Sequence, residues 1–244
     1  MLRPAQPHPA MSARGVLIPR PEPALWETAA AVAARGWQPV PAPALQLSPQ
    51  PLRAAPAQAV LLTSRAAARA LPTLPAGLPV LAVGEGTAAE MRARGHAPVW
   101  AAEGDAQALA ELAAGRLDPA GGPLLLAVGR GYALDLAAAL RARGFRVLRR
   151  VVYVARPAER LPEAAAAALA GGEVAQAMFF SPRSALVAMR LIVQAGCAGA
   201  LKGVRAVAIS QRVARCLAAL PWAGVVVAAR PDHAAMLEGL GCPP

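Results

Sequence analysis

Two polar segments of similar composition are candidates for binding an anion. Thr63-Ser64-Arg65 and Ser181-Pro182-Arg183-Ser184 each follow a short apolar run. Hydroxyl groups, backbone N–H groups and a guanidinium at the end of a strand suit a carboxylate or a phosphate, because ligands of open α/β sheets bind at the carboxyl edge. Helix capping would explain the hydroxyl groups. It would not explain why an arginine follows two residues later in both segments, which favours a role in ligand binding.

Two glycine-rich segments also suit an anion. Gly84-Glu85-Gly86-Thr87-Ala88-Ala89 matches G-x-G-x-x-A, and Glu103 lies about twenty residues further on, as in a dinucleotide fingerprint. A helix N-terminus that binds some other anion explains these glycines equally well. Gly129-Arg130-Gly131 is either an ordinary turn between a strand and a helix or an anion-binding loop with one arginine.

Tyr153, one of two tyrosines, is a candidate for proton transfer. It lies near the end of the long apolar segment 145–155, which leads to a break marked by Pro157. A tyrosine at such a crossover between domains could donate a proton to a bound ligand, or it could be a half-buried aromatic residue of the linker. The residues alone leave both interpretations open.

Other common chemistries have no signal in the sequence. The histidines, His233 among them, are isolated and have no partner at the spacing of a metal site or a catalytic triad. G-x-S-x-G, H-E-x-x-H and G-K-[ST] do not occur, and the three cysteines lack C-x-x-C spacing. We therefore expect no metal, no P-loop and no disulfide framework, and a reducing compartment.

The chain is strongly basic and poor in aromatic side chains. It has 244 residues, with 25 arginines and lysines against 14 acidic residues and a net charge of +11. A polyanionic partner explains this charge, and so does a compositional bias of the genome toward arginine and alanine. Aromatic residues make up only 4% and the arginines are scattered, which argues against nucleic acid. No apolar run reaches the roughly 18 residues of a membrane span.

Apolar segments of strand length alternate with amphipathic segments along most of the chain. This alternation is typical of parallel sheets covered on both faces, and about ten strands fit two five-stranded α/β units better than one sheet. Residues 1–13 carry three prolines and no apolar h-region, so we expect a flexible tail and no signal peptide, with Met11 as an alternative start. A weak internal repeat with a break near residue 118 favours duplication of one unit.

The expected strands are 15–19, 37–40, 59–63, 79–83, 97–101, 123–128, 145–155, 175–180, 204–209 and 224–229. The expected helices are 24–35, 64–71, 85–94, 105–114, 132–143, 162–169, 184–195, 211–220 and 232–240. Glycines end several of these helices, and Asp105 is the expected N-cap of the fourth. The prolines at 39, 41 and 43 predict a stiff, extended connector.

Six short signatures occur in order along about residues 15–240. They are Val16-Leu17-Ile18-Pro19-Arg20-Pro21, Thr63-Ser64-Arg65-Ala66, Ala82-Val83-Gly84 with Thr87-Ala88, Leu140 to Gly144 leading into Val152-Tyr153, Phe179-Phe180-Ser181-Pro182-Arg183-Ser184, and Ala208-Ile209-Ser210 ahead of Asp232. This ordered set resembles the uroporphyrinogen-III synthase family.

The resemblance implies two similar flavodoxin-like α/β domains with parallel sheets, joined by a two-stranded linker. In the family, the first βαβ unit folds with the C-terminal portion of the chain. The implied domains are 14–40 plus 158–244 and 44–153, with crossings at about 39–43 and 154–157. This division replaces the break near residue 118.

The implied reaction is the cyclisation of hydroxymethylbilane to uroporphyrinogen III in tetrapyrrole biosynthesis, the route to haem, cobalamin and chlorophyll. The terminal hydroxyl group leaves as water to give an azafulvene, and the far end of the bilane attacks through a spiro intermediate that inverts ring D. No cofactor is implied. The substrate carries eight carboxylates, which suit glycine and hydroxyl loops with arginines nearby.

The resemblance also implies roles for individual residues. Tyr153 would help the hydroxyl group to leave. Amides and side chains around six residues would hold the substrate carboxylates: Thr63, Ser64, Gly84, Thr87, Ser181 and Ser210. Arg20, Arg65 and Arg183 would supply charge, and the loop at Gly129 is added from its glycine-arginine pattern. The chain departs from many members at Ser210-Gln211-Arg212-Val213, where Arg212 offers charge in place of threonine hydroxyls.

We expect a cytoplasmic monomer that binds neither nucleic acid nor membrane and contacts the preceding enzyme of the pathway transiently. The alternative function is a two-domain α/β protein that binds a small anion or a nucleotide. Its nucleotide form would use the Gly84 loop, and stabilisation by NAD(P) would support it.

Overall fold

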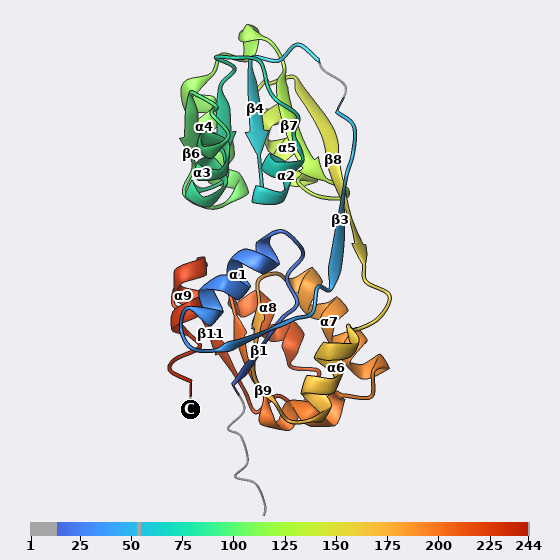
Figure 1. Ribbon diagram of the computed structural model, residues 1–244. Helices are drawn as coiled ribbons and strands as arrows, with labels where there is room; N and C mark the ends of the chain where they lie inside the picture. Colours follow the sequence, from blue (N-terminus) through green and yellow to red (C-terminus); the bar gives the residue numbers. More distant parts are fainter. Residues whose placement is uncertain (1–13, 53–54, 244) are drawn as a thin grey trace, which may run out of the picture. The chain divides into compact units, whose positions relative to one another are not determined.

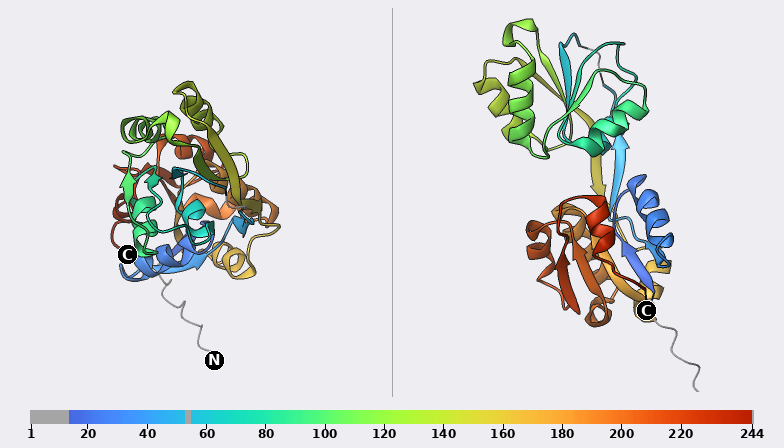
Figure 2. Two further views of the ribbon diagram at one scale, coloured as in Figure 1. Left: turned by 90° about the horizontal axis from the view of Figure 1, so that it is seen from above. Right: turned by 90° about the vertical axis from the view of Figure 1, so that its left-hand side faces the viewer.

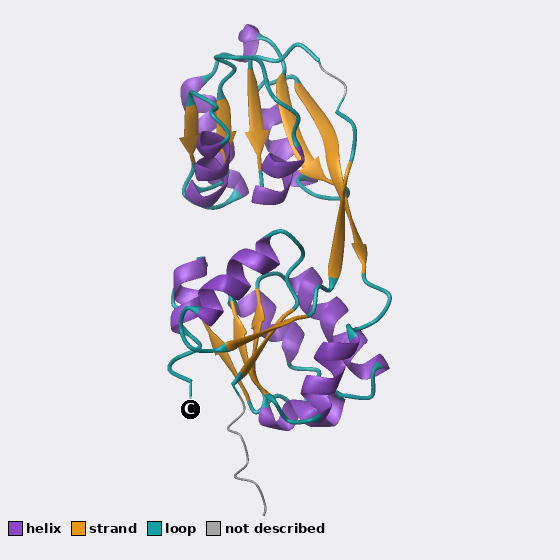
Figure 3. Ribbon diagram, viewed as in Figure 1, coloured by secondary structure: helices purple, strands orange, loops and turns teal. Residues whose placement is uncertain are grey.

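Residues 14–52 and 55–243 are described by a computed structural model, in which the chain forms two α/β units (Figure 1). Unit 1 comprises the chain up to Gln46 and from Arg156 onward, and unit 2 comprises Leu47–Ala155. Each unit contains one sheet with helices against it (Figure 3). The predicted tail at 1–13, with Met11, lies outside the described residues.

The sheet of unit 1 has five parallel strands in the order β11-β10-β9-β1-β2. The strands are β1 (Gly15–Ile18), β2 (Gln38–Pro41), β9 (Val174–Phe179), β10 (Arg205–Ala208) and β11 (Gly224–Val227). The helices are α1 (Ala24–Ala33), α6 (Glu163–Ala170), α7 (Pro182–Gln194), α8 (Gln211–Leu217) and α9 (His233–Glu238), with a 3₁₀ turn at Ala198–Gly203. The first βαβ segment therefore completes a sheet whose other strands come from the C-terminal part of the chain.

The core of unit 1 is divided between the two faces of its sheet. Successive side chains of a strand point to opposite faces. Leu17 packs in a cluster with residues of α6, α7 and α8. Val16 and Ile18 pack in a second cluster with Leu25 of α1 and Met236 of α9. Helices α1 and α9 thus cover the same face of the sheet.

The sheet of unit 2 has six strands in the order β3-β8-β7-β4-β5-β6. The strands are β3 (Leu45–Pro49), β4 (Ala59–Leu62), β5 (Val80–Ala82), β6 (Val99–Ala101), β7 (Leu124–Gly129) and β8 (Val147–Pro157). The helices are α2 (Arg65–Ala70), α3 (Glu85–Ala93), α4 (Ala106–Arg116) and α5 (Leu134–Ala142), with a 3₁₀ turn at Pro119–Gly121. Leu61 packs in one cluster with residues of α4 and α5, and α2 and α3 cover the other face (Figure 2, right).

Two strands connect the units, because β3 and β8 both extend across the points where the chain passes from one unit to the other. The amide of Gln50 donates to the carbonyl of Val152 at 2.8 Å, and the amide of Ala158 donates to the carbonyl of Ala44 at 2.9 Å. The partner numbers run in opposite directions, so β3 and β8 are antiparallel. The remaining neighbours in the sheet of unit 2 pair in parallel.

Most predicted elements are confirmed, and the largest difference lies between residues 38 and 49. The strand predicted at 37–40 is present as β2, an edge strand, where the missing N–H groups of Pro39 and Pro41 are tolerated. Pro41, predicted in the stiff extended connector, therefore belongs to this strand. The strand β3 was not predicted. The predicted N-cap Asp105 is confirmed, since it accepts the Ala108 amide at 2.7 Å.

Candidate active site

The carboxyl edge of the sheet in unit 2 brings together four of the predicted site segments. The strands β8, β7, β4 and β5 are neighbours and run in parallel, so their carboxyl ends lie along one edge. Thr63 and Ser64 follow β4, Gly84 follows β5, and Gly129 ends β7. Tyr153 of β8 is the register partner of Gly129.

Tyr153 lies directly over the backbone of Gly129. A Cβ atom added at Gly129 would lie 2.6 Å from Cζ and 2.8 Å from the phenol oxygen of Tyr153. The amide of Arg130 donates to the Tyr153 carbonyl at 3.0 Å, which fixes the start of the following loop against β8. The tyrosine is buried, with 9% of its surface exposed. The phenol is therefore held at the carboxyl edge by a contact that only a glycine permits.

The loop after β7 is held by a second contact from β8. Arg149 donates from Nε and Nη2 to the carbonyl oxygen of Tyr132, at 3.0 and 2.8 Å. The next residue, Ala133, has φ +59°, a left-handed conformation that is uncommon for a residue with a side chain. Tyr132 and Leu134 are 41% and 62% exposed. The glycine-arginine segment at 129–131 is thus part of an anchored loop.

The serines of the predicted site cap helices, which is the alternative to ligand binding that the sequence left open for their hydroxyl groups. Ser64 accepts the Ala67 amide at 3.1 Å at the start of α2, and Ser210 accepts the Val213 amide at 3.4 Å at the start of α8. A capping hydroxyl uses a lone pair for this bond, so its proton is still able to donate to a ligand oxygen. Capping and ligand binding are therefore compatible for Ser64 and Ser210.

The remaining residues predicted in unit 2 differ in exposure. Gly84 is the N-cap of α3, with an extended backbone, and a Cβ added there would make only ordinary contacts, at 3.7 Å and beyond. Thr87 is buried on the inner side of α3. Arg65 is half-buried, and its Cδ lies 3.9 Å from the position of a Cβ added at Gly86, so its stem lies against the start of α3.

The carboxyl edge of the sheet in unit 1 gathers the other predicted residues. Arg20 follows β1, Ser181 follows β9 and Ser210 follows β10, and these three strands are neighbours. Ser181 accepts the Ser184 amide at 3.1 Å and donates to the Ser184 hydroxyl at 3.0 Å. Arg183 lies half-buried and Arg212 exposed in the first turns of α7 and α8.

Three residues that the sequence did not single out as site residues surround Arg20. Nη1 of Arg20 donates to the hydroxyl of Thr28 at 3.0 Å, and Nε2 of His233 lies 3.3 Å from that hydroxyl. The guanidinium carbon of Arg20 lies 4.2 Å from the centroid of the Phe180 ring. His233, which is isolated in the sequence, is therefore a member of a polar cluster. Thr28 and His233 are 205 residues apart, so no spacing in the sequence connects them.

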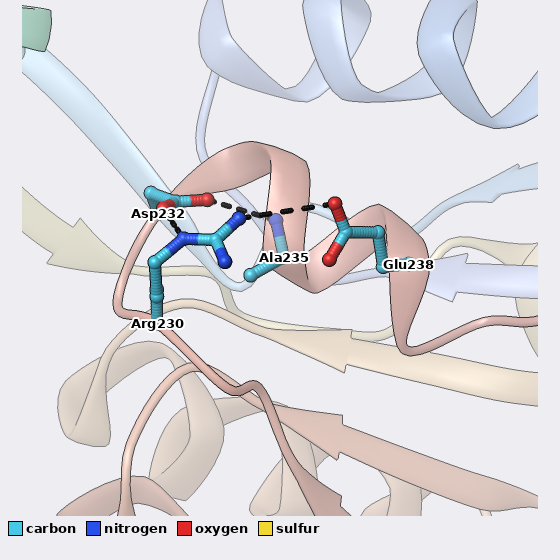
Figure 4. Close-up of polar contacts among 4 residues, drawn as sticks. All are labelled: Arg230, Asp232, Ala235 and Glu238. Carbon is cyan, nitrogen blue, oxygen red and sulfur yellow. Dashed lines mark hydrogen bonds and ion pairs between the residues drawn. The ribbon is translucent and has the colours of Figure 1, made fainter.

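Asp232, which directly precedes His233 in the chain, caps α9 (Figure 4). Two contacts hold the pKa of Asp232 below its ordinary value. The larger effect comes from the Ala235 amide, which donates to the Asp232 carboxylate at 2.8 Å, and the smaller from Arg230, whose Nε lies 3.1 Å from the carboxylate. Arg230 also lies 3.8 Å from a carboxylate oxygen of Glu238. The negative charge of Asp232 is thus satisfied within α9 and its leading turn.

The lowered pKa of Asp232 predicts a dependence of stability on pH. Its stabilising contribution is complete above the ordinary aspartate pKa and is lost as the pH falls through the lower pKa of the folded state. Asp232→Asn keeps a capping oxygen but has no charge to lose. Below about pH 4, we expect the free energy of unfolding to fall more steeply for the wild-type protein than for this variant. Parallel curves in urea titrations from pH 6 to pH 3 would contradict the assignment.

Neither a metal-binding cluster nor a membrane-spanning helix is found in the described ranges. Across residues 14–52 and 55–243, no three His, Cys, Asp or Glu side chains are grouped so that they could hold a metal ion. In that same part of the chain, no helix has both the length and the apolar character needed to cross a membrane.

A comparison with protein-family models identifies the family to which the chain belongs. The family model described as "Uroporphyrinogen-III synthase HemD" matches residues 27–238, which is most of the chain. The chain belongs to the uroporphyrinogen-III synthase family. Family membership makes it an enzyme of tetrapyrrole biosynthesis that acts on a small molecule.

Solved structures of synthases share the fold. The chain is similar to uroporphyrinogen-III synthetase from Helicobacter pylori, with 18% identity, a TM-score of 0.63 and coverage of 93% of this chain and 98% of that one. It is also similar to a mutant uroporphyrinogen III synthase from Thermus thermophilus, with 21% identity, a TM-score of 0.55 and coverage of 93% and 97%. These comparisons confirm the predicted α/β fold class. None of the curated proteins matches the chain in sequence.

Proposed function

We propose that this chain closes hydroxymethylbilane to uroporphyrinogen III, with loss of water and inversion of ring D. The observation that supports this most strongly, beside family membership, is the position of Tyr153 over Gly129 at the carboxyl edge of its sheet. A buried phenol fixed by its neighbours is suited to donate a proton at one defined place. No observation favours the nucleotide-binding alternative.

The first step requires a proton for the leaving hydroxyl group. The phenol O–H of Tyr153 would donate to that oxygen, so that the C–O bond breaks and water leaves with the bonding electrons. The carbon left behind becomes an azafulvene, stabilised by the adjacent pyrrole nitrogen. The substituted α carbon of ring D in the same bilane then attacks this carbon to form the spiro intermediate. The bond from that α carbon to the methylene bridge of ring C breaks, which leaves a second azafulvene on ring C. The free α carbon of ring D attacks the bridge carbon and closes the macrocycle, and the proton that this α carbon loses balances the one donated. The protein's main contribution to this second step would be to hold the two ends together.

Each unit offers donors for carboxylates of the substrate at the carboxyl edge of its own sheet. In unit 2 the proposed contacts are the segments at Thr63, Ser64 and Arg65, the start of α3 at Gly84 and Thr87, and the loop at Gly129. The start of α3 would contribute its backbone, because the Thr87 side chain is buried. In unit 1 they are Arg20, Ser181, Arg183, Ser210 and Arg212. Guanidinium groups and capped helix starts are both donors that suit carboxylates. The net charge of +11 would also speed capture of a polyanion.

The consumption of hydroxymethylbilane tests this proposal. The substrate closes spontaneously, so its disappearance is followed with and without the protein. We expect an enzyme-dependent rate well above the spontaneous one, saturable in substrate and unaffected by chelators or by NAD(P). A rate equal to the spontaneous one from a folded sample would overturn the proposal. The expectation of a cytoplasmic monomer with transient contact to the preceding enzyme stays a prediction.

A further inference from the structure

The hydroxyl group of Thr28 is the centre of a buried polar network in unit 1. Thr28 lies in α1 and is fully buried. Its hydroxyl donates to the Ala24 carbonyl at 3.0 Å, accepts from Nη1 of Arg20 at 3.0 Å and lies 3.3 Å from Nε2 of His233. A hydroxyl has one proton and two lone pairs. The direction of the His233 contact depends on the imidazole tautomer. With the hydroxyl proton directed to Ala24, the Nε2–H form of His233 is the one that donates to the hydroxyl oxygen, beside Nη1 of Arg20.

This assignment makes the network independent of the charge on His233. The neutral Nε2–H tautomer and the imidazolium both donate from Nε2. The ring of His233 also lies near that of Phe180, with centroids 6.0 Å apart and planes inclined by 34°. The acidic neighbour Asp232 is bound to Arg230 and to the Ala235 amide. His233 is therefore held by two contacts, between its ring and that of Phe180 and between its Nε2 and the Thr28 hydroxyl.

Arg20 is constrained in two ways by this network. Its Nη1 is bound to the buried hydroxyl of Thr28, and its guanidinium carbon lies over the Phe180 ring. Arginine loses considerable rotamer entropy when it is fixed by a ligand. A side chain that is already ordered loses less of this entropy on binding, so its affinity for a carboxylate is higher.

We propose that Thr28 and His233 are positioning residues, which hold Arg20 as a pre-ordered cation for a carboxylate of the substrate. The proposal rests on the proposed function for the identity of the substrate. The positioning itself is argued only from the contacts among four residues: Arg20, Thr28, His233 and Phe180. It adds Thr28 and His233, neither of which the sequence patterns pick out as site residues.

Binding of an octacarboxylate to the full chain tests the positioning. The probe is uroporphyrin III, whose fluorescence reports binding without turnover. Thr28→Val removes the hydroxyl and is expected to weaken the affinity about 10-fold, the usual effect of losing a hydrogen bond to a charged group. Thr28→Ser restores the hydroxyl and is expected to bind within about threefold of wild type. Thr73→Val, at an exposed threonine, is the matched control and should bind as wild type does.

A double-variant cycle separates positioning from a general loss of stability. Arg20→Met removes the cation and is expected to weaken binding about 10-fold or more. Because Thr28 acts through Arg20, Thr28→Val should cause no further loss in the Arg20→Met background. In turnover, Thr28→Val should raise KM more than it lowers kcat. If Thr28→Val does not fold, His233→Phe is measured in its place, with the same lack of additivity expected.

The outcomes distinguish this inference from the proposed function. Unchanged affinity in Thr28→Val, strictly additive losses in the cycle, or no uroporphyrin binding by the wild-type chain would each overturn the positioning. Non-additive losses from a chain that does not consume hydroxymethylbilane would support the positioning and overturn the proposed function. Turnover of hydroxymethylbilane that is insensitive to Thr28→Val would support the proposed function and overturn the positioning.

Discussion

Replacing Tyr153 by phenylalanine is expected to lower kcat for ring closure by at least about 100-fold, the usual size of a general-acid contribution. The variant keeps the ring that lies over Gly129 and loses only the phenol oxygen, which sits 2.8 Å from the position of a Cβ added there. Without the phenol proton, the hydroxyl group of the bilane would have to leave unassisted. Single-turnover rates with hydroxymethylbilane measure this step.

Tyr132→Phe is the matched control for this variant. Tyr132 is the other tyrosine of the chain and is 41% exposed in the loop after β7, where Arg149 donates to its carbonyl oxygen. We expect its turnover and its melting temperature to equal those of the wild-type protein. Unchanged turnover in Tyr153→Phe, with the fold verified by circular dichroism, would remove Tyr153 from the chemistry.

Replacing Gly129 by alanine is expected to affect both stability and turnover. The new Cβ would lie 2.6 to 2.9 Å from three atoms of the Tyr153 side chain, so the ring must move. The ring is buried in β8 and has little room to move, so we expect a loss of about 1–3 kcal/mol in the free energy of unfolding. A displaced phenol would also lower kcat by about 10-fold or more. Urea denaturation and single-turnover kinetics measure the two effects.

Gly115→Ala and a double variant control for this substitution. A Cβ added at Gly115, inside α4, meets nothing within 4 Å, so alanine there should stabilise the protein by about 0.5–1 kcal/mol. In the Tyr153→Phe background, Gly129→Ala should lower kcat much less than in the wild-type protein, since the phenol is already absent. An equal loss in both backgrounds would show that Gly129 acts independently of Tyr153.

The fold was largely predictable because both faces of each sheet are covered. A strand covered on both faces is a continuous apolar run, as in Ala59–Leu62, whose four residues are all buried. Leu45–Pro49 was missed because it alternates apolar and polar residues within a proline-rich stretch. That alternation, with a period of two, is itself a strand signal. The prolines concealed it.

The residues of the candidate site were predictable only where each lies in or directly after a single apolar strand. Tyr153 and the loops at Ser64 and Ser181 could be recognised because each belongs to or follows its own apolar strand. The contact of Tyr153 with Gly129 depends on the register between β7 and β8, which shifts just before Gly129. Local sequence does not encode such a shift. The cluster of Thr28 and His233 depends on the packing of α1 and α9 against one face of a sheet.

The isomer composition of the product decides whether this chain is a working synthase. Hydroxymethylbilane is generated in place, the product is oxidised, and the uroporphyrin isomers are separated by chromatography. We expect mostly isomer III in the presence of the wild-type chain and isomer I in its absence. Isomer I alone from a demonstrably folded sample would contradict the proposal that this chain inverts ring D, and it would show that the fold of the family is present here without its reaction.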